Sequence, residues 1–149
     1  MPMIDVYAPA GAFEDKHELA RRLAAAVMAV EEVPDIAMFR QNTAAFIHEL
    51  PADTISNVDG GSDYVRVQVL INAGPLDRNK QIAMVDRLSE LIATAPGKPP
   101  APERIWVVLT EAPEGGWGLW GHAHTNAELV AAARRELANL APGKETTGE

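Results

Sequence analysis

The sequence predicts an α+β fold made of two βαβ units in tandem, and two observations carry this prediction. A strand, an amphipathic helix and a second strand occur within residues 2–51 and recur in the same order within 64–113. Residues at matching turns and strand ends also recur, at offsets of 63 and 62 residues. The recurring pairs are Ala10-Gly11 with Ala73-Gly74, and Glu49-Leu50-Pro51 with Glu111-Ala112-Pro113. The offset exceeds the roughly 20–50 residues of solenoid repeats, and right-handed crossovers would place both helices on one face of a four-stranded sheet.

The first unit is predicted from local signals that follow one another closely. Residues 3–8 are typical of a short strand. Asp15 and Glu18 have the spacing of a capping box, and apolar residues then recur at helical intervals, which predicts a helix over 15–32. Residues 43–49 form the second predicted strand, and a loop rich in Asn, Asp and Gly follows.

The second unit repeats this plan. Residues 64–73 are strongly β-prone, Asp77 is a candidate N-cap, and residues 78–94 have the apolar spacing of a helix. Residues 104–111 form the fourth predicted strand. Its nearly continuous apolar run predicts burial on both faces.

The segment that follows is predicted to add a hairpin and a helix to a single domain spanning residues 1–149. Glycines and tryptophans alternate within 114–121, which is typical of a tight hairpin. Thr125 and Glu128 form a second capping box, and the helix that they open is expected to end near residue 139, within a 114–140 segment. Residues 142–149 are predicted to be a disordered tail.

Composition excludes several classes of function. The net charge of −8 over 149 residues argues against nucleic-acid partners and against binding to an anionic membrane. The chain has no cysteine, which excludes disulfides, thiol catalysis and cysteine metal sites. The start lacks the features of a signal peptide, and no apolar run reaches the ~20 residues of a membrane span. We therefore expect a cytoplasmic protein.

The two strands of the second unit also predict self-association. Residues 64–73 and 104–111 carry apolar side chains at both odd and even positions, which point to opposite faces of the sheet. Neither face therefore has the polar residues expected of a solvent-exposed face. A single layer of two helices cannot cover both faces, and a large exposed apolar area usually marks an interface. We expect a homo-oligomer with closed cyclic symmetry.

Pro2 is the candidate catalytic residue. A small residue after the initiator Met normally permits removal of Met1, which would leave Pro2 as a free secondary amine. Burial in an apolar pocket would disfavour the ammonium form and lower its pKa, toward the range in which a general base works best. Because many chains start Met-Pro without catalytic consequence, the rest of the sequence must support this role.

That support comes from a resemblance to the tautomerase superfamily, whose members are βαβ units with an amino-terminal proline as the catalytic base. It covers about residues 2–121 and rests on Pro2 leading into the first strand, on the tandem repeat, and on the segment I105-W-V-V-L-T-E-A-P-E-G-G-W-G-L-W-G121. This segment resembles the end of a 4-oxalocrotonate tautomerase unit, and Trp117 takes the place of its active-site aromatic. The two-unit length resembles the cis-3-chloroacrylic acid dehalogenase branch, which implies a homotrimer.

The sequence departs from the family at its substrate-binding cations. The arginine that binds a carboxylate after the first strand aligns with Ala12 or Phe13 in one half and with Pro75 in the other. The remaining family positions hold no matching residue either. The arginine of the last strand aligns with Ala44 and Trp106, the paired arginines of the dehalogenase branch with Asn72 and Pro75, and its helix histidine with Val27. Glu114 is the only acid near the position of its water-activating residue.

Residue type and position indicate the remaining candidates. Arg40 could supply the displaced cation for a substrate carboxylate, and Asn72 could hydrogen-bond a developing oxyanion or act only in a turn. Trp106 and Trp117 could wall the pocket, or belong to the core or to an interface. His48 is expected to be a structural histidine with its hydrogen bonds satisfied. We expect surface positions for His122 and His124, as hairpin residues rather than metal ligands, and for Arg78. The charged residues at 14–16 and 31–32 are expected to be solvated helix ends.

Together these features predict a cofactor-independent tautomerase that acts on a small carboxylate, as an enol or α-keto acid. The amine of Pro2 would remove a proton α to a carbonyl and return it at another atom. Two alternatives stay open at this point. One is a non-catalytic trimeric binding protein that kept the fold, and the other is a hydratase or dehalogenase that uses Glu114 on haloacrylic or acetylenic acids.

Overall fold

The computed structural model describes residues 1–141, and the predicted disordered tail at 142–149 lies outside the described residues. The elements are, in order, β1 (Met3–Pro9), α1 (Lys16–Glu31), α2 (Ala37–Gln41), β2 (Ala44–Leu50), η1 (Ala52–Thr54), β3 (Val65–Ile71), α3 (Arg78–Ala93), η2 (Pro102–Arg104), β4 (Ile105–Glu111), β5 (Trp117–Leu119), β6 (His122–His124) and α4 (Asn126–Leu140). The short helix α2 was not expected from the sequence. Every helix within residues 1–141 is too short or too polar to cross a membrane.

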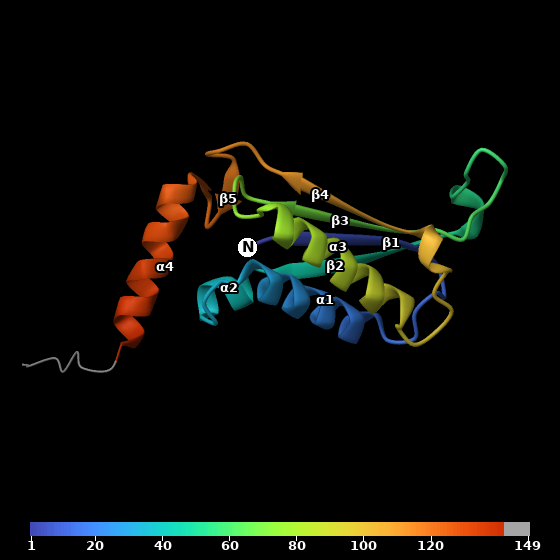
Figure 1. The fold of residues 1–149 in the computed structure, drawn as a ribbon, viewed down its shortest axis with the longest axis horizontal. Helices are drawn as coiled ribbons and strands as arrows, with labels where there is room; N and C mark the ends of the chain where they lie inside the picture. The colour runs from blue at the N-terminus through green and yellow to red at the C-terminus, as the bar shows by residue number, and fades with distance from the viewer. Residues whose placement is uncertain (142–149) are drawn as a thin grey trace, which may run out of the picture.

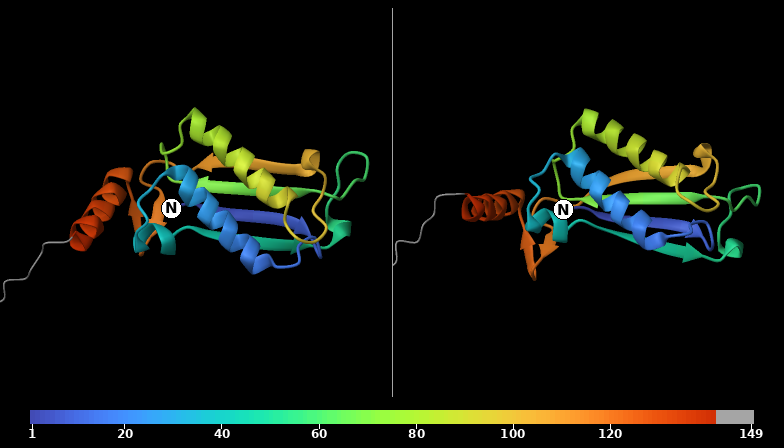
Figure 2. Two further views of the ribbon diagram at one scale, coloured as in Figure 1. Left: turned by 60° about the horizontal axis from the view of Figure 1, so that its bottom comes forward. Right: turned by 90° about the horizontal axis from the view of Figure 1, so that it is seen from below.

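The main sheet has four strands in the order β2-β1-β3-β4 (Figure 1). β1 and β2 are parallel, β3 and β4 are parallel, and β1 meets β3 antiparallel at the centre. Helices α1 and α3 cross the same face of this sheet, as two further views show (Figure 2). The predicted α+β fold of two βαβ units, with a C-terminal hairpin and an extra helix, is therefore confirmed.

Local signals start each long helix where the sequence predicted. Asp15 accepts a hydrogen bond from the Glu18 amide at 3.0 Å, and Asp77 accepts one from the Lys80 amide at 2.9 Å. Thr125 and Glu128 form a complete capping box at the start of α4. These contacts satisfy amides that have no partner inside the helix.

The core lies between the sheet and the two helices. Alternate residues of β1 and β3 point into it, and Ile4, Val6, Val67 and Val69 are fully buried there. α1 contributes Leu23, and α3 contributes a row of equally buried residues that includes Leu88 and Ile92. This alternation between two faces is what a sheet with one packed face requires.

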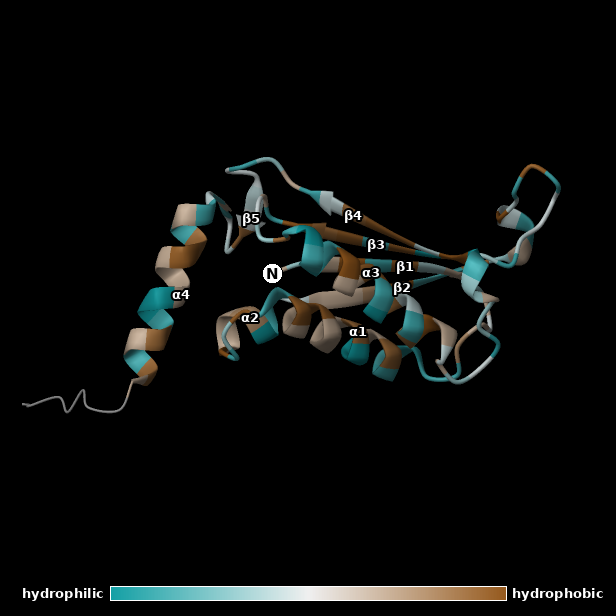
Figure 3. Cartoon of the chain, in the orientation of Figure 1, coloured by the Kyte–Doolittle hydropathy of each residue, from teal (hydrophilic) through white to brown (hydrophobic). Residues whose placement is uncertain are grey.

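The other face of the sheet is largely uncovered within residues 1–141. Large apolar side chains are exposed on it, with exposed fractions of 51% for Phe46, 53% for Trp106 and 49% for Val108. Figure 3 colours the ribbons of β3 and β4 largely hydrophobic, which counts the residues of both sheet faces together. Polar pairs also occur there, since His48 lies 2.7 Å from Asp5 and stacks on Tyr7, which agrees with the structural role expected for it.

Candidate active site

A cavity of about 470 Å³ lies at the end of the sheet where the chain begins. We call it the N-terminal cavity. The N-terminus, β5 and α4 are all found at this end (Figure 1). Its lining residues come from the chain start, the end of α1 and the segment after it, the turn after β3, and one side of α4. They are Met1, Glu31, Val33, Pro34, Phe39, Asn72, Ala73, Gly74, Pro75, Asn126, Leu129, Val130, Ala133, Arg134 and Leu137.

The chain start is buried in this cavity rather than projecting into solvent. Met1 is only 3% exposed and packs with Leu129 and Ala133 of α4, and Pro2 is buried beside it. Burial lowers the pKa of the terminal amine below its usual value, and the opposing effect of the nearby Glu31 carboxylate is smaller. The fold therefore holds an amine in a setting that favours its neutral, basic form.

Glu31 is the acidic residue of the cavity, and the sequence did not identify it. The interpretation of residues 31–32 as a solvated helix end is correct for Glu32, which is exposed, and wrong for Glu31, which is 6% exposed. Its Oε2 lies 3.6 Å from the terminal amine, and burial raises the pKa of its carboxyl. The cause of the error is nonlocal, since the chain start lies against Glu31 and the cavity that Glu31 lines is completed by α4.

Asn72 lies on the cavity wall, in an amide network with the start of α4. Its Nδ2 donates to Asn126 Oδ1 at 2.9 Å, and Asn126 Nδ2 donates to the carbonyl oxygen of Ala73. Glu114 accepts a hydrogen bond from the backbone amide of Asn126 at 2.7 Å. Glu114 therefore anchors the first turn of α4, and it is not among the residues that line the cavity.

The two candidate tryptophans lie at different ends of the sheet. Trp117 is 7% exposed and belongs to the same apolar cluster as Met1, behind the cavity wall. Trp106 is near the start of β4, at the opposite end (Figure 1), where it borders a different hollow with Tyr7 and Tyr64. Within one chain, only Trp117 is close to the amine.

Arg40 also lies outside the N-terminal cavity. Its guanidinium pairs with Asp35 at 2.9 Å, both side chains are largely exposed, and it borders a separate hollow with Thr43 and Ala44. The side-chain cation that does line the cavity is Arg134, on α4. Arg134 makes no ion pair with any other residue of 1–141, and a regular amphipathic helix gave no signal that would have distinguished it from its neighbour Arg135.

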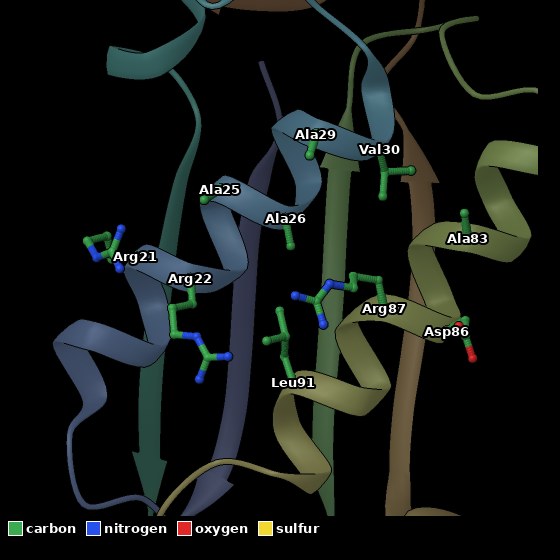
Figure 4. A pocket seen from close by; sticks show the side chains of 10 residues that line it. All are labelled: Arg21, Arg22, Ala25, Ala26, Ala29, Val30, Ala83, Asp86, Arg87 and Leu91. Carbon is green, nitrogen blue, oxygen red and sulfur yellow. The ribbon is translucent and has the colours of Figure 1, made fainter.

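Arginines also gather at another hollow, of about 620 Å³, between α1 and α3. Figure 4 shows Ala26 on the side of α1 that faces α3, with the guanidinium groups of Arg22 and Arg87 extending toward the gap between the helices. The terminal amine does not reach this hollow. A metal centre has no support among residues 1–141, because no three of the ligating side chains come together there.

Comparisons with known proteins agree with this architecture. Residues 64–126 match the family model described as Tautomerase enzyme. No curated protein matches the sequence significantly. The family match covers the second unit, the hairpin and the first residue of α4.

Similar solved structures extend over both units. A fused 4-OT symmetric trimer, Q0, is 18% identical with a TM-score of 0.70, over 85% of this chain and 98% of that one. N1, a member of the cis-3-chloroacrylic acid dehalogenase family, is 16% identical with a TM-score of 0.66, over 93% and 99%. The macrophage migration inhibitory factor-like protein of Entamoeba histolytica is 16% identical with a TM-score of 0.60, over 83% and 96%. The resemblance to the tautomerase superfamily with fused βαβ units is confirmed.

Proposed function

We propose that this chain, which has the fold of the tautomerase superfamily, is a cofactor-independent keto–enol tautomerase whose base is the amine of Pro2 after removal of Met1. The observation that supports this most is the position of the chain start. The terminal amine lies inside a cavity, next to apolar side chains of α4, and burial lowers its pKa.

Removal of Met1 would leave the new terminal amine in the same region of the cavity. Standard bond lengths put successive backbone nitrogens within about 3.7 Å of each other, so the nitrogen of Pro2 would stay close to the present position of the amine. The volume now filled by the Met1 side chain would become available to a substrate. A neutral secondary amine there could take a proton from a carbon next to a carbonyl.

The walls of the cavity suggest how a substrate would lie. Arg134 is placed to pair with a carboxylate, for which a planar guanidinium is well suited, and the amide of Asn72 is placed to hydrogen-bond an oxygen. Phe39, Val130 and Leu137 would face an apolar or aryl group. The substrate would then be a small α-keto acid or its enol. Arg40 and Trp106, which lie elsewhere in the chain, could contact it only across a subunit interface.

We further propose that the protein is a homotrimer. The uncovered sheet face with Phe46, Trp106 and Val108 needs a partner surface. Q0, R7 and F6, three of the similar fused 4-OT structures, are described as trimers. The hydratase alternative has less support, because Glu114 is bonded to the Asn126 amide outside the cavity.

An enol-ketonisation assay with phenylpyruvate enol tests the proposed base. Intact mass should first show that Met1 is absent. Pro2→Ala keeps a terminal amine but loses the secondary amine and the ring that positions it, and should lower the rate by about 10²-fold or more. The rate of Pro51→Ala, which changes an exposed loop, should equal that of the wild type. Equal rates above background for the wild type and Pro2→Ala would mean that the Pro2 amine is not the base, and no activity in the wild type would favour the non-catalytic binding protein.

The role of Arg134 is tested with the same substrate. Arg134→Gln should raise KM by about tenfold or more, since a hydrogen bond to a charged group contributes about 1.5–3 kcal/mol. Arg135→Gln, which changes an exposed neighbour on the same helix, is the matched control. An unchanged KM in Arg134→Gln would place the carboxylate elsewhere.

A further inference from the structure

Glu31 is a buried carboxyl that the architecture does not explain. It ends α1, lines the N-terminal cavity, and is 6% exposed. Its Oε2 is near the terminal amine at 3.6 Å, while Oε1 is buried with no hydrogen-bond partner among residues 1–141. A buried polar atom without a partner costs about 1–3 kcal/mol, so a purely structural role is a poor account of it.

The second unit shows that the fold does not need a carboxyl at this place. α1 and α3 are both 16-residue helices, and their last residues are Glu31 and Ala93 respectively. Ala93 completes its helix with no polar side chain. Since the duplicated helix ends well with alanine, the unpaired oxygen of Glu31 is available for a molecule in the cavity.

We propose that Glu31 is the general acid that protonates the carbonyl oxygen of the substrate while the Pro2 amine removes the proton from the adjacent carbon. This inference rests on the function proposed above and adds a second catalytic residue to it. Glu31 would thereby polarise the carbonyl in a chain that lacks the family's arginines at the matching positions.

The distances are compatible with both transfers in one substrate. The nitrogen of Pro2 lies within roughly 7 Å of Glu31 Oε2, given 3.6 Å from the present amine and about 3.7 Å between successive nitrogens. A carbon and its neighbouring carbonyl oxygen fit between them if each is about 3 Å from its proton partner. The Met1 side chain now occupies part of that space.

The proton count of the step balances. The amine takes the proton on the α-carbon, the electron pair of that C–H bond forms the C=C bond, and the carbonyl π pair moves to oxygen, which takes the Glu31 proton. The neutral amine and carboxyl thus become an ammonium and a carboxylate as the ketone becomes the enol. Ketonisation is the reverse, and proton transfer within the pair restores the starting state.

The charged groups around Glu31 come from three elements. The terminal amine is closest, Arg134 of α4 lines the same cavity, and Lys80 of α3 donates from Nζ to the backbone oxygen of Glu31 at 3.0 Å. Burial has a larger effect on the pKa of the carboxyl than the terminal amine and Lys80 have, and raises it. The same low polarity lowers the pKa of the amine, so both members of the pair are moved toward their neutral forms.

This assignment also restricts the substrate class. One carboxylate can pair with Arg134, but a second one near the carbonyl would meet Glu31, which becomes negatively charged during enolisation. We therefore expect monocarboxylic α-keto acids with an apolar group to react well, and dicarboxylic ones to react poorly.

The test compares Glu31→Gln with Glu32→Gln, its exposed neighbour, and with Pro2→Ala. Gln can hydrogen-bond a carbonyl but cannot transfer a proton, so Glu31→Gln should lower kcat for ketonisation by about 10²-fold with KM within threefold of wild type. The limb of the pH–kcat profile that belongs to Glu31 should disappear. Glu32→Gln should behave as wild type.

The outcomes separate this inference from the proposed function. A kcat in Glu31→Gln within twofold of wild type, with Pro2→Ala inactive, would overturn the role of Glu31 and leave the amine mechanism intact. Full activity in Pro2→Ala would overturn both. If Glu31→Gln does not fold, Glu31→Asp serves instead: withdrawing the carboxyl by one methylene should lower kcat at least tenfold, and an unchanged kcat would contradict the proposal.

Discussion

The two βαβ units of this chain have the same framework and different ends. Each has a seven-residue first strand, a 16-residue helix and a seven-residue last strand. Each helix starts at an aspartate cap, and the turn after each first strand is closed in the same way. The Gly11 amide donates to Glu49 at 3.5 Å, and the Gly74 amide donates to Glu111 at 3.3 Å.

The ends differ in the groups that matter for chemistry. Pro2 precedes β1 as the candidate terminal amine, whereas Tyr64 precedes β3 inside the chain and has a peptide nitrogen. Glu31 ends α1 and Ala93 ends α3. The comparison teaches that duplication supplies the framework, while the proposed activity depends on one end of one unit, where α4 adds the cavity wall.

The largest expected effect comes from making the first unit resemble the second at its start. Inserting one Gly between Met1 and Pro2 would turn the Pro2 nitrogen into a tertiary amide without a basic lone pair. The ketonisation rate should fall by about 10²–10⁴-fold, with an unchanged circular dichroism spectrum. Adding a Gly after Glu149 is the control, and retained activity in the N-terminal variant would mean that the two units do not differ as described.

Core substitutions should affect both units alike. Leu23 of α1 and Leu88 of α3 are each fully buried. Replacing either by Ala should lower the free energy of unfolding by about 2–5 kcal/mol, as measured by urea denaturation. Val58→Ala, at a fully exposed loop residue, should change it little. A strong effect at only one leucine would show that the two halves of the core are not equivalent.

The pH dependence of stability should distinguish Glu31 from Ala93. Because the pKa of Glu31 is raised above its usual 4.5, the unfolded chain loses this proton first, and the free energy of unfolding falls as pH rises above that value. Glu31→Gln lacks this term. The free energy of unfolding of Glu31→Gln, relative to that of the wild type, should therefore increase between pH 4.5 and pH 8 in urea denaturation. Ala93→Gln should show no such trend. A difference between Glu31→Gln and the wild type that does not change with pH would mean that the carboxyl is not held protonated.

The smallest effects are expected at the paired helix caps. Asp15→Ala and Asp77→Ala each remove one side-chain hydrogen bond to a first-turn amide. Each should lower the free energy of unfolding by about 0.5–2 kcal/mol, measured by thermal or urea unfolding. Asn at either position keeps an acceptor oxygen and should restore most of the loss. A cap that mattered in one unit alone would weaken the equivalence of the two frameworks.

The framework could be predicted because its signals are local. Caps at Asp15, Asp77 and Thr125 and the apolar periods beside them fixed the long helices to within two residues. α2, with five residues and no cap hydrogen bond, has no comparable signal. The exposed apolar sheet face was also predicted, because the strands of the second unit have apolar residues at both odd and even positions.

The candidate site could be predicted only in part, because its groups meet through long-range packing. Pro2 was predicted from its place after Met1, Asn72 from its residue type and place, and Trp117 from the family pattern, and the structure brings all three to the same end of the sheet. Glu31 resembled a solvated charge because its neighbour Glu32 is one. In the fold it lies against the chain start and lines a cavity that it shares with α4, about a hundred residues later in the chain. Arg134 likewise became a candidate for binding a substrate carboxylate only because the fold places α4 on the wall of the N-terminal cavity.

The central claim is that the Pro2 nitrogen is a free amine with a lowered pKa inside the cavity. An NMR titration of protein labelled with ¹⁵N-proline measures this directly. We predict one proline nitrogen that titrates, with a pKa below the range of about 7.7–8.0 that is usual for α-amino groups, and that is missing from Pro2→Ala. A Pro2 nitrogen that behaves as an amide, or that titrates at or above that range, would contradict the account.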